Sequence, residues 1–259
     1  MSETINYELI GRVAVIRLNR PQVFNSFNRE MALALQKKLD EASADPMVRT
    51  IVLTGTGKAF CAGQDLAEVS GPEAPGFRTI LSEHYNPIIT RLRAIPKPVV
   101  AAVNGVAAGA GANIALACDV VLASTSSSFI QAFSKIGLVP DSGGTFFLPR
   151  MIGFQKASAL MITGDKVVAA EAERLGMVYK VYEEAEFMDK VMNHAHELAA
   201  MPTHAIHLIK KLLNSSMTSN LYEQLDLEEK YQIEAGQTSD YKEGVTAFME
   251  KRKPNFEGK

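Results

Sequence analysis

One carboxylate, Asp141, stands between apolar residues and glycines in the segment 129–145, and two runs of small residues precede it in the chain. The first run, 59–66, reads AFCAGQDL, and the second, 104–113, reads NGVAAGAGAN. Small residues let the backbone approach a ligand closely. N–H groups at the start of a helix carry partial positive charge, which suits a developing oxyanion. If the two runs converged, two N–H donors would surround one oxygen atom, and a nearby carboxylate could transfer protons.

Each segment also has a purely structural interpretation. A glycine-rich turn between a strand and a helix commonly serves close packing alone, and Pro140-Asp141-Ser142-Gly143 is typical of an ordinary turn in which Asp bonds its own backbone. Neither small-residue run matches GxGxxG with a downstream acid or GxxxxGK[ST], so a dinucleotide or nucleoside triphosphate site is disfavoured. Taken singly, the segments do not separate packing from catalysis.

The composition limits the classes of protein to consider. With 259 residues, 47% of them hydrophobic, the chain can build one large core or a main domain with an appendage. A formal charge of −2 with mixed signs gives no general attraction for nucleic acid or an anionic membrane. Cys61 and Cys118 lie far apart in apolar stretches, and no grouping of Cys, His and acids predicts a metal site. No signal peptide or membrane span is expected, which favours a cytoplasmic protein.

The order of the secondary-structure signals predicts an α/β core. Short β-branched runs predict strands at 13–18, 51–53, 98–103 and 120–122. Apolar residues spaced about four apart, from Met31 to Ala42, predict a helix after the first strand, and a small-residue helix is expected from near Gly109. Strands that alternate with helices are typical of α/β proteins. After about residue 183 the strand signals stop, and amphipathic helices are predicted at 187–200, 204–213 and 222–235.

Four stretches together resemble the crotonase superfamily, also called the enoyl-CoA hydratase/isomerase family. They are FCAGQDL at 60–66, NGVAAGAGA at 104–112, AFSKIGLVPD at 132–141 and YKEGV at 241–245. The likeness runs in order from about residue 7 to 256, and within the family it is strongest to isomerases of the 1,2-epoxyphenylacetyl-CoA type. It implies an α/β fold, with a spiral of ββα units over residues 1–195 and a helical C-terminal region over 196–259. It also implies that this region forms a homotrimer, often stacked as a hexamer.

The resemblance further implies a site for an acyl-CoA substrate, with no separate cofactor because coenzyme A is part of the substrate. The backbone N–H groups of Gln64 and Ala110 would form an oxyanion hole for the thioester oxygen, and Asp141 would be the acid/base. The implied contacts to coenzyme A and substrate are Gln22, Val23, Ala62, Asp65, Leu66, Val106, Gly109, Asn113, Phe133, Phe248 and Lys251.

The residues at these positions favour isomerisation. Hydratases of the family use two glutamates, and the matching positions here hold Asn113 and Phe133, neither of which transfers a proton to or from water. Family isomerases carry one carboxylate at the position matching Asp141. We therefore expect a double-bond shift from 3-enoyl-CoA to 2-enoyl-CoA, or rearrangement of a ring epoxide of the 1,2-epoxyphenylacetyl-CoA to oxepin-CoA type. The acyl group itself stays open, because residues 71–89 shape the pocket and 71–77 reads as a mobile loop.

Three alternatives remain beside isomerisation. An enoyl-CoA hydratase would need acids at other positions, because 113 and 133 hold Asn and Phe. A 4-chlorobenzoyl-CoA-type dehalogenase would use Asp141 as a nucleophile but also needs a histidine and a tryptophan. The chain has no Trp, Asn86 stands near the histidine position, and His84 is two residues away, on the wrong face of a regular helix. A non-catalytic binding protein, for example for RNA, would show a basic surface that the scattered charges do not predict.

Overall fold

The computed structural model describes residues 3–70 and 74–259. Its larger sheet has six strands, in which β1 and β2 pair antiparallel and all other neighbours pair parallel. In spatial order these are β1 (Ile5–Ile10), β2 (Val13–Leu18), β3 (Thr50–Gly55), β5 (Val99–Val103), β7 (Val120–Ser124) and β10 (Lys180–Tyr182). The four β-branched runs predicted as strands lie in β2, β3, β5 and β7.

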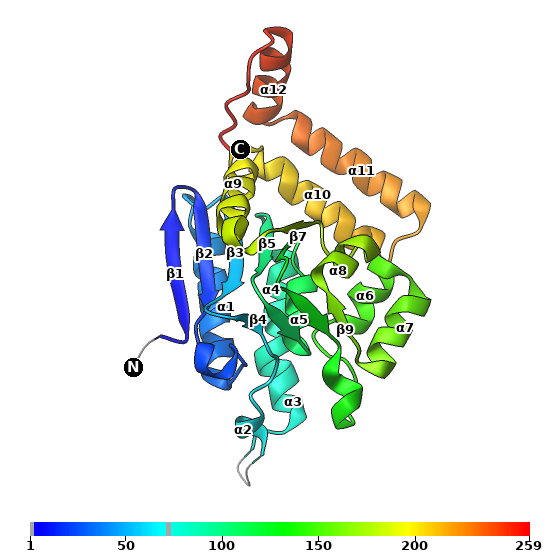
Figure 1. Ribbon diagram of the computed structural model, residues 1–259. Helices are drawn as coiled ribbons and strands as arrows, with labels where there is room; N and C mark the ends of the chain where they lie inside the picture. The colour runs from blue at the N-terminus through cyan, green and yellow to red at the C-terminus, as the bar shows by residue number, and fades with distance from the viewer. Residues whose placement is uncertain (1–2, 71–73) are drawn as a thin grey trace.

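A smaller sheet is built from three-residue strands. Its order is β4 (Ala59–Cys61), β6 (Val106–Ala108), β8 (Ser128–Ile130) and β9 (Lys166–Val168), with only β9 antiparallel. Each of β3, β5 and β7 in the large sheet is followed directly by β4, β6 or β8 in the small one, and then by helix. This repeated ββα unit confirms the predicted α/β architecture (Figure 1).

Helices follow the strands on the chain and cover the sheets. After β2 come the short 3₁₀ helix Pro21–Val23 and α1 (Arg29–Ala44), and after β4 come α2 (Leu66–Val69), α3 (Phe77–Thr79), a π-helical turn at Ile80–Tyr85 and α4 (Asn86–Ala94). After β6 comes α5 (Ala110–Leu116), and after β8 come a 3₁₀ helix at Ala132–Ile136, α6 (Gly144–Ile152) and α7 (Phe154–Thr163). After β9 comes α8 (Ala169–Leu175). The loop predicted at 71–77 falls partly outside the described residues, and Phe77 already begins α3.

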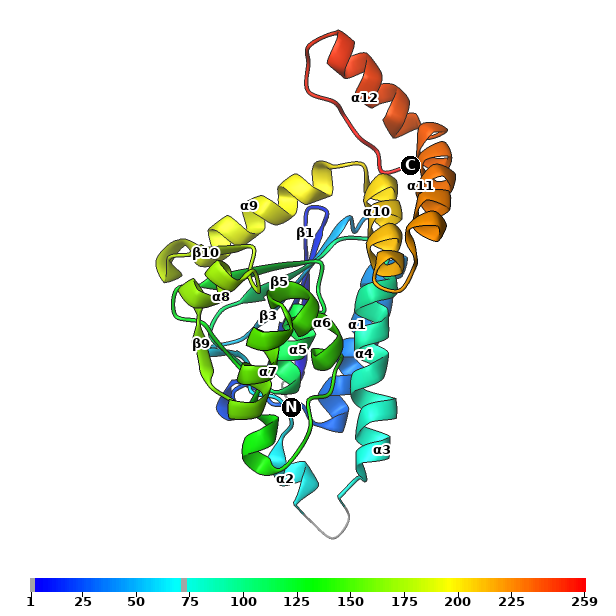
Figure 2. The same ribbon diagram turned by 90° about the vertical axis from the view of Figure 1, so that its right-hand side faces the viewer.

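The large sheet is covered on both faces, as its unbroken apolar strands require. Alternate residues of β2 show this arrangement. Val13 and Val15 pack with α9 (Phe187–Ala200), whereas Ala14 and Ile16 belong to the main core with α1, α4 and α5. Figure 2 shows α9 and α4 separated by the sheet. The strands β4 and β6, which end in the small-residue turns, follow directly on β3 and β5 of this covered sheet.

The C-terminal region is helical, as predicted, and contains one helix more than predicted. The helices α9, α10 (Thr203–Ser216) and α11 (Leu221–Gly236) correspond to the three expected, and α12 (Ser239–Met249) is additional. The proposed boundary between 195 and 196 falls inside α9. Figures 1 and 2 show α12 beyond α11, away from both sheets. Within residues 3–70 and 74–259, no helix has the length and apolar character needed to cross a membrane.

A buried ion pair joins α10 to the core. The Nζ atom of Lys210, a residue 4% exposed, lies 2.7 Å from Oδ2 of Asp119. The other carboxylate oxygen of Asp119 lies 3.1 Å from the Arg93 guanidinium. Burial lowers the pKa of Lys210, and the Asp119 charge opposes that shift. At the other end of α10, the Arg49 guanidinium donates to the Phe256 carbonyl (2.7 Å) and to the Thr203 hydroxyl (2.8 Å). These contacts hold the start of the helical region and the chain end against the core.

Candidate active site

A cavity of about 250 Å³ lies where the two small-residue turns meet the chain around Asp141. The ends of β4 and β6 supply one side, the 3₁₀ helix at 132–136 and the following loop supply another, and α2, α3 and the π-helical turn close it. The lining residues are Ala62, Gly63, Gln64, Leu66, Val69, Phe77, Ile80, Leu81, Tyr85, Gly109, Ala110, Ala132, Phe133, Ile136, Leu138 and Asp141.

The two small-residue turns lie against each other in the structure. Gly63 has φ +93°, and a Cβ atom built on it would lie 3.0 Å from the carbonyl oxygen of Ala108 and 3.6 Å from the nitrogen of Ala110. An L-residue at 63 would therefore meet both a strained backbone and the second turn. The glycine is needed because the two turns approach so closely, which is the convergence considered from the sequence.

Two backbone donors at this junction have no hydrogen-bond acceptor among the residues that the structure describes. The backbone N–H of Phe27 donates to the Gly63 carbonyl (2.7 Å), and the Phe27 carbonyl accepts from the Asp65 N–H (2.8 Å). These bonds lie on either side of Gln64 and leave the N–H of Gln64 itself unused. Ala110 is the first residue of α5, whose initial N–H groups have no helical acceptor. Within the described part of the chain, neither the Gln64 N–H nor the Ala110 N–H donates a hydrogen bond. Because both residues line the cavity, the pair has the composition of a two-donor oxyanion hole.

Asp141 faces the same cavity in an environment that favours its neutral form. Burial raises the pKa of its carboxyl above the ordinary value, and a 2.9 Å hydrogen bond from the Ser142 hydroxyl opposes part of that rise. Of the described residues that line the cavity, Asp141 alone carries a carboxylate. A raised pKa brings a carboxylate closer to the value needed for exchanging protons with carbon acids near neutral pH.

The positions that match the hydratase glutamates hold side chains with other roles. Phe133, 6% exposed, lines the cavity. Asn113 is fully buried; its Nδ2 donates to the Asp141 carbonyl (2.9 Å), and its Oδ1 accepts from Gln131 Nε2 (2.8 Å). A Cβ atom on Gly144 would lie 2.4 Å from Asn113 Nδ2, so only glycine fits there. Asn113 therefore supports the Asp141 backbone and does not line the cavity.

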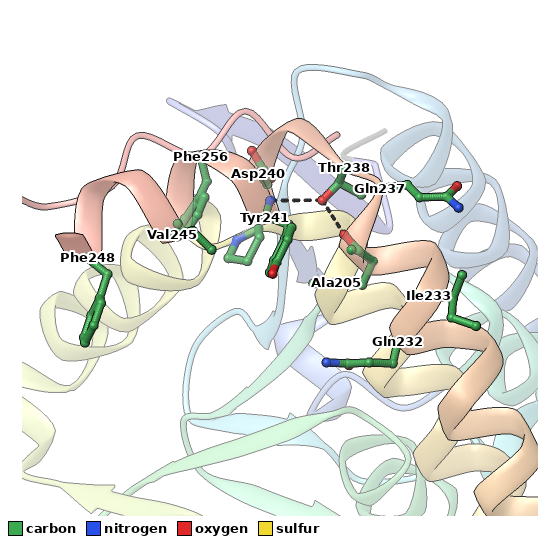
Figure 3. A pocket seen from close by; sticks show the side chains of 14 residues that line it. Ala205, Gln232, Ile233, Gln237, Thr238, Asp240, Tyr241, Val245, Phe248 and Phe256 are labelled. Atoms are coloured by element: carbon green, nitrogen blue, oxygen red, sulfur yellow. Dashed lines mark hydrogen bonds between the residues drawn. The ribbon is translucent and has the colours of Figure 1, made fainter. Parts of the chain in front are cut away.

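The other residues implied as coenzyme A contacts divide into two groups. Ala62, Leu66 and Gly109 line the cavity together with Gln64, Ala110 and Phe133. The structure places Gln22, Val23, Asp65, Val106, Phe248 and Lys251 outside its lining. Asp65 caps the start of α2 and lies 2.8 Å from Arg20. Phe248 is 81% exposed and lines a separate groove (Figure 3) on α12, which lies at the far end of the molecule (Figure 1).

Tyr85 is a cavity residue that the sequence reasoning missed. Its hydroxyl donates to Gln64 Oε1 at 2.8 Å, and the residue is 1% exposed. It ends the π-helical turn Ile80–Tyr85, in which the N–H of Asn86 donates to the carbonyl of Leu81, five residues back. The regular helical spacing assumed from the sequence does not hold across such a turn, so no pattern in the sequence pointed to Tyr85.

Two other chemistries lack their residues at this cavity. The histidine considered for a dehalogenase, His84, is 1% exposed, does not line the cavity, and has its Nε2 3.4 Å from an Arg29 guanidinium nitrogen. Among the residues whose placement is described, no three His, Cys, Asp or Glu side chains gather as a metal site would require. The described lining residues therefore offer one carboxylate and two free backbone donors.

Comparisons with known proteins show the family of the chain. The Enoyl-CoA hydratase/isomerase family matches residues 8–259. The chain is 46% identical over 263 residues to a 1,2-epoxyphenylacetyl-CoA isomerase from Escherichia coli (strain K12), with 100% of both chains covered. It is 44% identical over 256 residues to a "probable enoyl-CoA hydratase" from Rhodobacter capsulatus, covering 99% of this chain and 98% of that one.

Solved structures show the same relationship. A crystal structure of an enoyl-CoA hydratase from Bacillus anthracis matches with a TM-score of 0.91 and 32% identity, over 99% of this chain and 100% of that one. The resemblance to the crotonase superfamily and the fold it implied are thereby confirmed. The ββα spiral, the converging turns and these matches lead to one conclusion: the chain is an enzyme that belongs to the enoyl-CoA hydratase/isomerase family.

Proposed function

We propose that this enzyme is an acyl-CoA isomerase that uses Asp141 as its only acid/base. The observation that carries the proposal is the meeting, in one apolar cavity, of one partly buried carboxylate with the N–H groups of Gln64 and Ala110, which donate no hydrogen bond within the described residues. A thioester oxygen bound between the two donors would gain stabilisation as negative charge develops on it.

A single carboxylate is sufficient for an isomerisation. Asp141 would take a proton from one carbon of the acyl chain, the oxyanion hole would hold the resulting thioester enolate, and the protonated Asp141 would return the proton to another carbon. The proton given back is the one removed, so no second acid is required. The apolar lining from Phe133, Leu138 and Ile136 limits water near the enolate.

Hydration needs a positioned water molecule, and the described residues that line the cavity include no second carboxylate to activate it. Positioned acid/base catalysis contributes about 10²–10⁴-fold per group. With Asn113 engaged behind Asp141 and Phe133 apolar, we expect hydration to be slow. The hydratase name of the Rhodobacter capsulatus relative is the reason to measure hydration directly.

The acyl group is proposed from chemistry and from one relative. A 3-enoyl-CoA and the ring epoxide of phenylacetyl-CoA both form a thioester enolate when a proton leaves the carbon next to the carbonyl. The Escherichia coli relative is named for the epoxide reaction, which supports 1,2-epoxyphenylacetyl-CoA as the first substrate to test and a role in phenylacetate degradation. Both reactions use the same carboxylate and the same oxyanion hole.

The test is incubation of the enzyme with 3-hexenoyl-CoA, 1,2-epoxyphenylacetyl-CoA and crotonyl-CoA in parallel. Ultraviolet absorbance follows formation of a conjugated product, and mass analysis separates isomers from products that have gained water. The proposal predicts unchanged mass with the first or second substrate and little hydration of the third. Hydration of crotonyl-CoA faster than either isomerisation would contradict it.

We also propose that the helical C-terminal region mediates self-association into a trimer or a stacked hexamer. A groove of about 770 Å³ between α11 and α12 is lined by apolar side chains such as Ile233, Tyr241 and Val245 (Figure 3). Phe248 beside it is 81% exposed, which leaves a large apolar surface for a partner to cover. Light scattering should give a mass of at least three times the 28.2 kDa of one chain. A monodisperse monomer would contradict the assignment.

A further inference from the structure

Gln64 supplies more than its backbone to the cavity wall. Its side-chain amide lies between two partners, with Oε1 accepting from the Tyr85 hydroxyl (2.8 Å) and Nε2 donating to a Glu68 carboxylate oxygen (2.8 Å). The other Glu68 oxygen accepts from the backbone N–H of Arg29 (2.7 Å), the first residue of α1. One end of the amide is thus bound to Tyr85, 21 residues away, and the other is linked through Glu68 to the start of α1.

Chemistry fixes the direction of this chain of hydrogen bonds. The Glu68 carboxylate can only accept when ionised, so the NH₂ group of Gln64 must face it. The amide oxygen then faces Tyr85, whose hydroxyl must donate. Burial raises the pKa of Tyr85 well above its ordinary value, so the hydroxyl keeps the proton that it donates. Turning the amide around would set two acceptors against each other at Glu68.

The π-helical turn places Tyr85 for this contact. One extra residue in a turn rotates all following side chains by about 100° around the helix axis. The carbonyls of Glu83 and His84, at the end of the turn, accept from Gln36 Nε2 on α1 at 2.7 and 3.2 Å. The Tyr85 ring also packs edge-on against Phe27, with 5.9 Å between ring centroids. The irregular turn is therefore held by specific side chains and presents a hydroxyl to the cavity wall.

We propose that Tyr85 and Glu68 act as positioning residues, holding the Gln64 side chain from opposite ends so that its backbone N–H stays directed at the thioester oxygen. The inference rests on the proposed oxyanion hole. Phe27 fixes the peptide groups on either side of Gln64, and the side-chain amide adds a third fixed point. Three fixed points set the orientation of the donor before substrate arrives, which is the preorganisation that oxyanion stabilisation needs.

The decisive variant is Tyr85→Phe, which keeps the ring packed on Phe27 and removes only the hydroxyl. Because the donor is needed most in the transition state, kcat should fall by about tenfold while KM changes by less than about twofold. Glu68→Ala removes the acceptor of the Gln64 NH₂ group and should lower kcat in the same way, and it alters no core residue. Tyr7→Phe, which removes a tyrosine hydroxyl outside the cavity lining, is the matched control and should leave kcat unchanged.

A double-mutant cycle decides whether Tyr85 acts through Gln64. Gln64→Met removes the amide and keeps the chain length, so Tyr85→Phe should cause no further loss of kcat in that background. An unchanged kcat in Tyr85→Phe overturns the proposal, and so do losses that multiply in the double variant, because Tyr85 would then act independently of Gln64.

Binding measurements separate this inference from the proposed function. Calorimetry would compare acetoacetyl-CoA with free coenzyme A, since the enolate of acetoacetyl-CoA places negative charge on the thioester oxygen, as the transition state does. If the wild-type enzyme isomerises neither test substrate, the proposed function is wrong, and the binding ratio still decides the positioning role. A lower preference for the thioester in Tyr85→Phe than in Tyr7→Phe supports that role, and an equal preference overturns it.

Discussion

The Nδ2 atom of Asn113 donates a 2.9 Å hydrogen bond to the backbone carbonyl oxygen of Asp141. Asn113 lies three residues after Ala110 on α5, so one short helix carries both a proposed oxyanion donor and the support of the proposed acid/base. The same carbonyl accepts from the N–H of Gly144 (2.9 Å). One short helix therefore presents one of the two proposed donors and contacts the backbone of Asp141.

Removing the Asn113 side chain should reduce activity more than removing another asparagine side chain that makes similar hydrogen bonds to the backbone. Asn113→Ala leaves the Asp141 carbonyl with one donor and the buried Gln131 amide unpaired, so we expect a loss of stability of about 1–3 kcal/mol and a fall in kcat of about tenfold or more. Asn104→Ala is the control, because Asn104 also bonds backbone groups, at Gly55 and Gly57, but outside the cavity. Equal kcat values in the two variants, measured beside their unfolding curves, would refute the role of Asn113.

The partly buried carboxylate of Asp141 should cost stability at neutral pH. Its pKa is raised in the folded state, so the folded protein binds more protons than the unfolded chain, and stability falls as pH rises through the folded-state pKa. Asn cannot ionise. Asp141→Asn should therefore raise the melting temperature at about pH 8 and raise it less at about pH 4. Thermal unfolding at both values checks this, with exposed Asp165→Asn as the surface control; a gain that is larger at the lower pH would have the wrong sign.

The N–H of Ala110 can be removed with a small change in shape. Ala110 is the first residue of α5, a position that accepts proline. Gly109 before it has φ 54° and ψ −128°, the mirror image of the extended conformation that proline favours in its predecessor, and glycine is achiral. Ala110→Pro should lower kcat by about 10²–10³-fold for every thioester substrate. Circular dichroism and sizing establish that the fold is kept, and a folded variant with full activity would remove Ala110 from the oxyanion hole.

The regular parts of this fold were predictable because each has a strong local signal. The predicted strand 13–18 and helix 187–200 coincide with β2 and α9, since the first is a β-branched run and the second has clear apolar periodicity. The three-residue strands of the small sheet have no such signal, because their pairing is decided by the large sheet beneath them. Helix α12 was not predicted, and its large apolar side chains face outward, as the 81% exposure of Phe248 shows.

The candidate site was predictable where its residues are adjacent in sequence. The small-residue turns and Asp141 were recognised as motifs, and the structure brings them to one cavity. The contacts that support them join distant segments: Tyr85 reaches Gln64, and Gln131 reaches Asn113. Tyr85 depends on a π-helical turn, and Asn113 matches the position of a catalytic acid while serving as a backbone support. Neither role follows from residue type and spacing, because both depend on which buried groups meet in three dimensions.

The most direct test of the central claim is the turnover of Asp141→Asn with the substrate that the wild-type enzyme isomerises fastest. Asn keeps the volume of Asp and cannot exchange the proton, so kcat should fall by about 10²-fold or more while affinity for the acyl-CoA, measured by calorimetry, stays within about threefold of wild type. A folded Asp141→Asn enzyme with near-normal turnover would contradict the assignment of Asp141 as the acid/base.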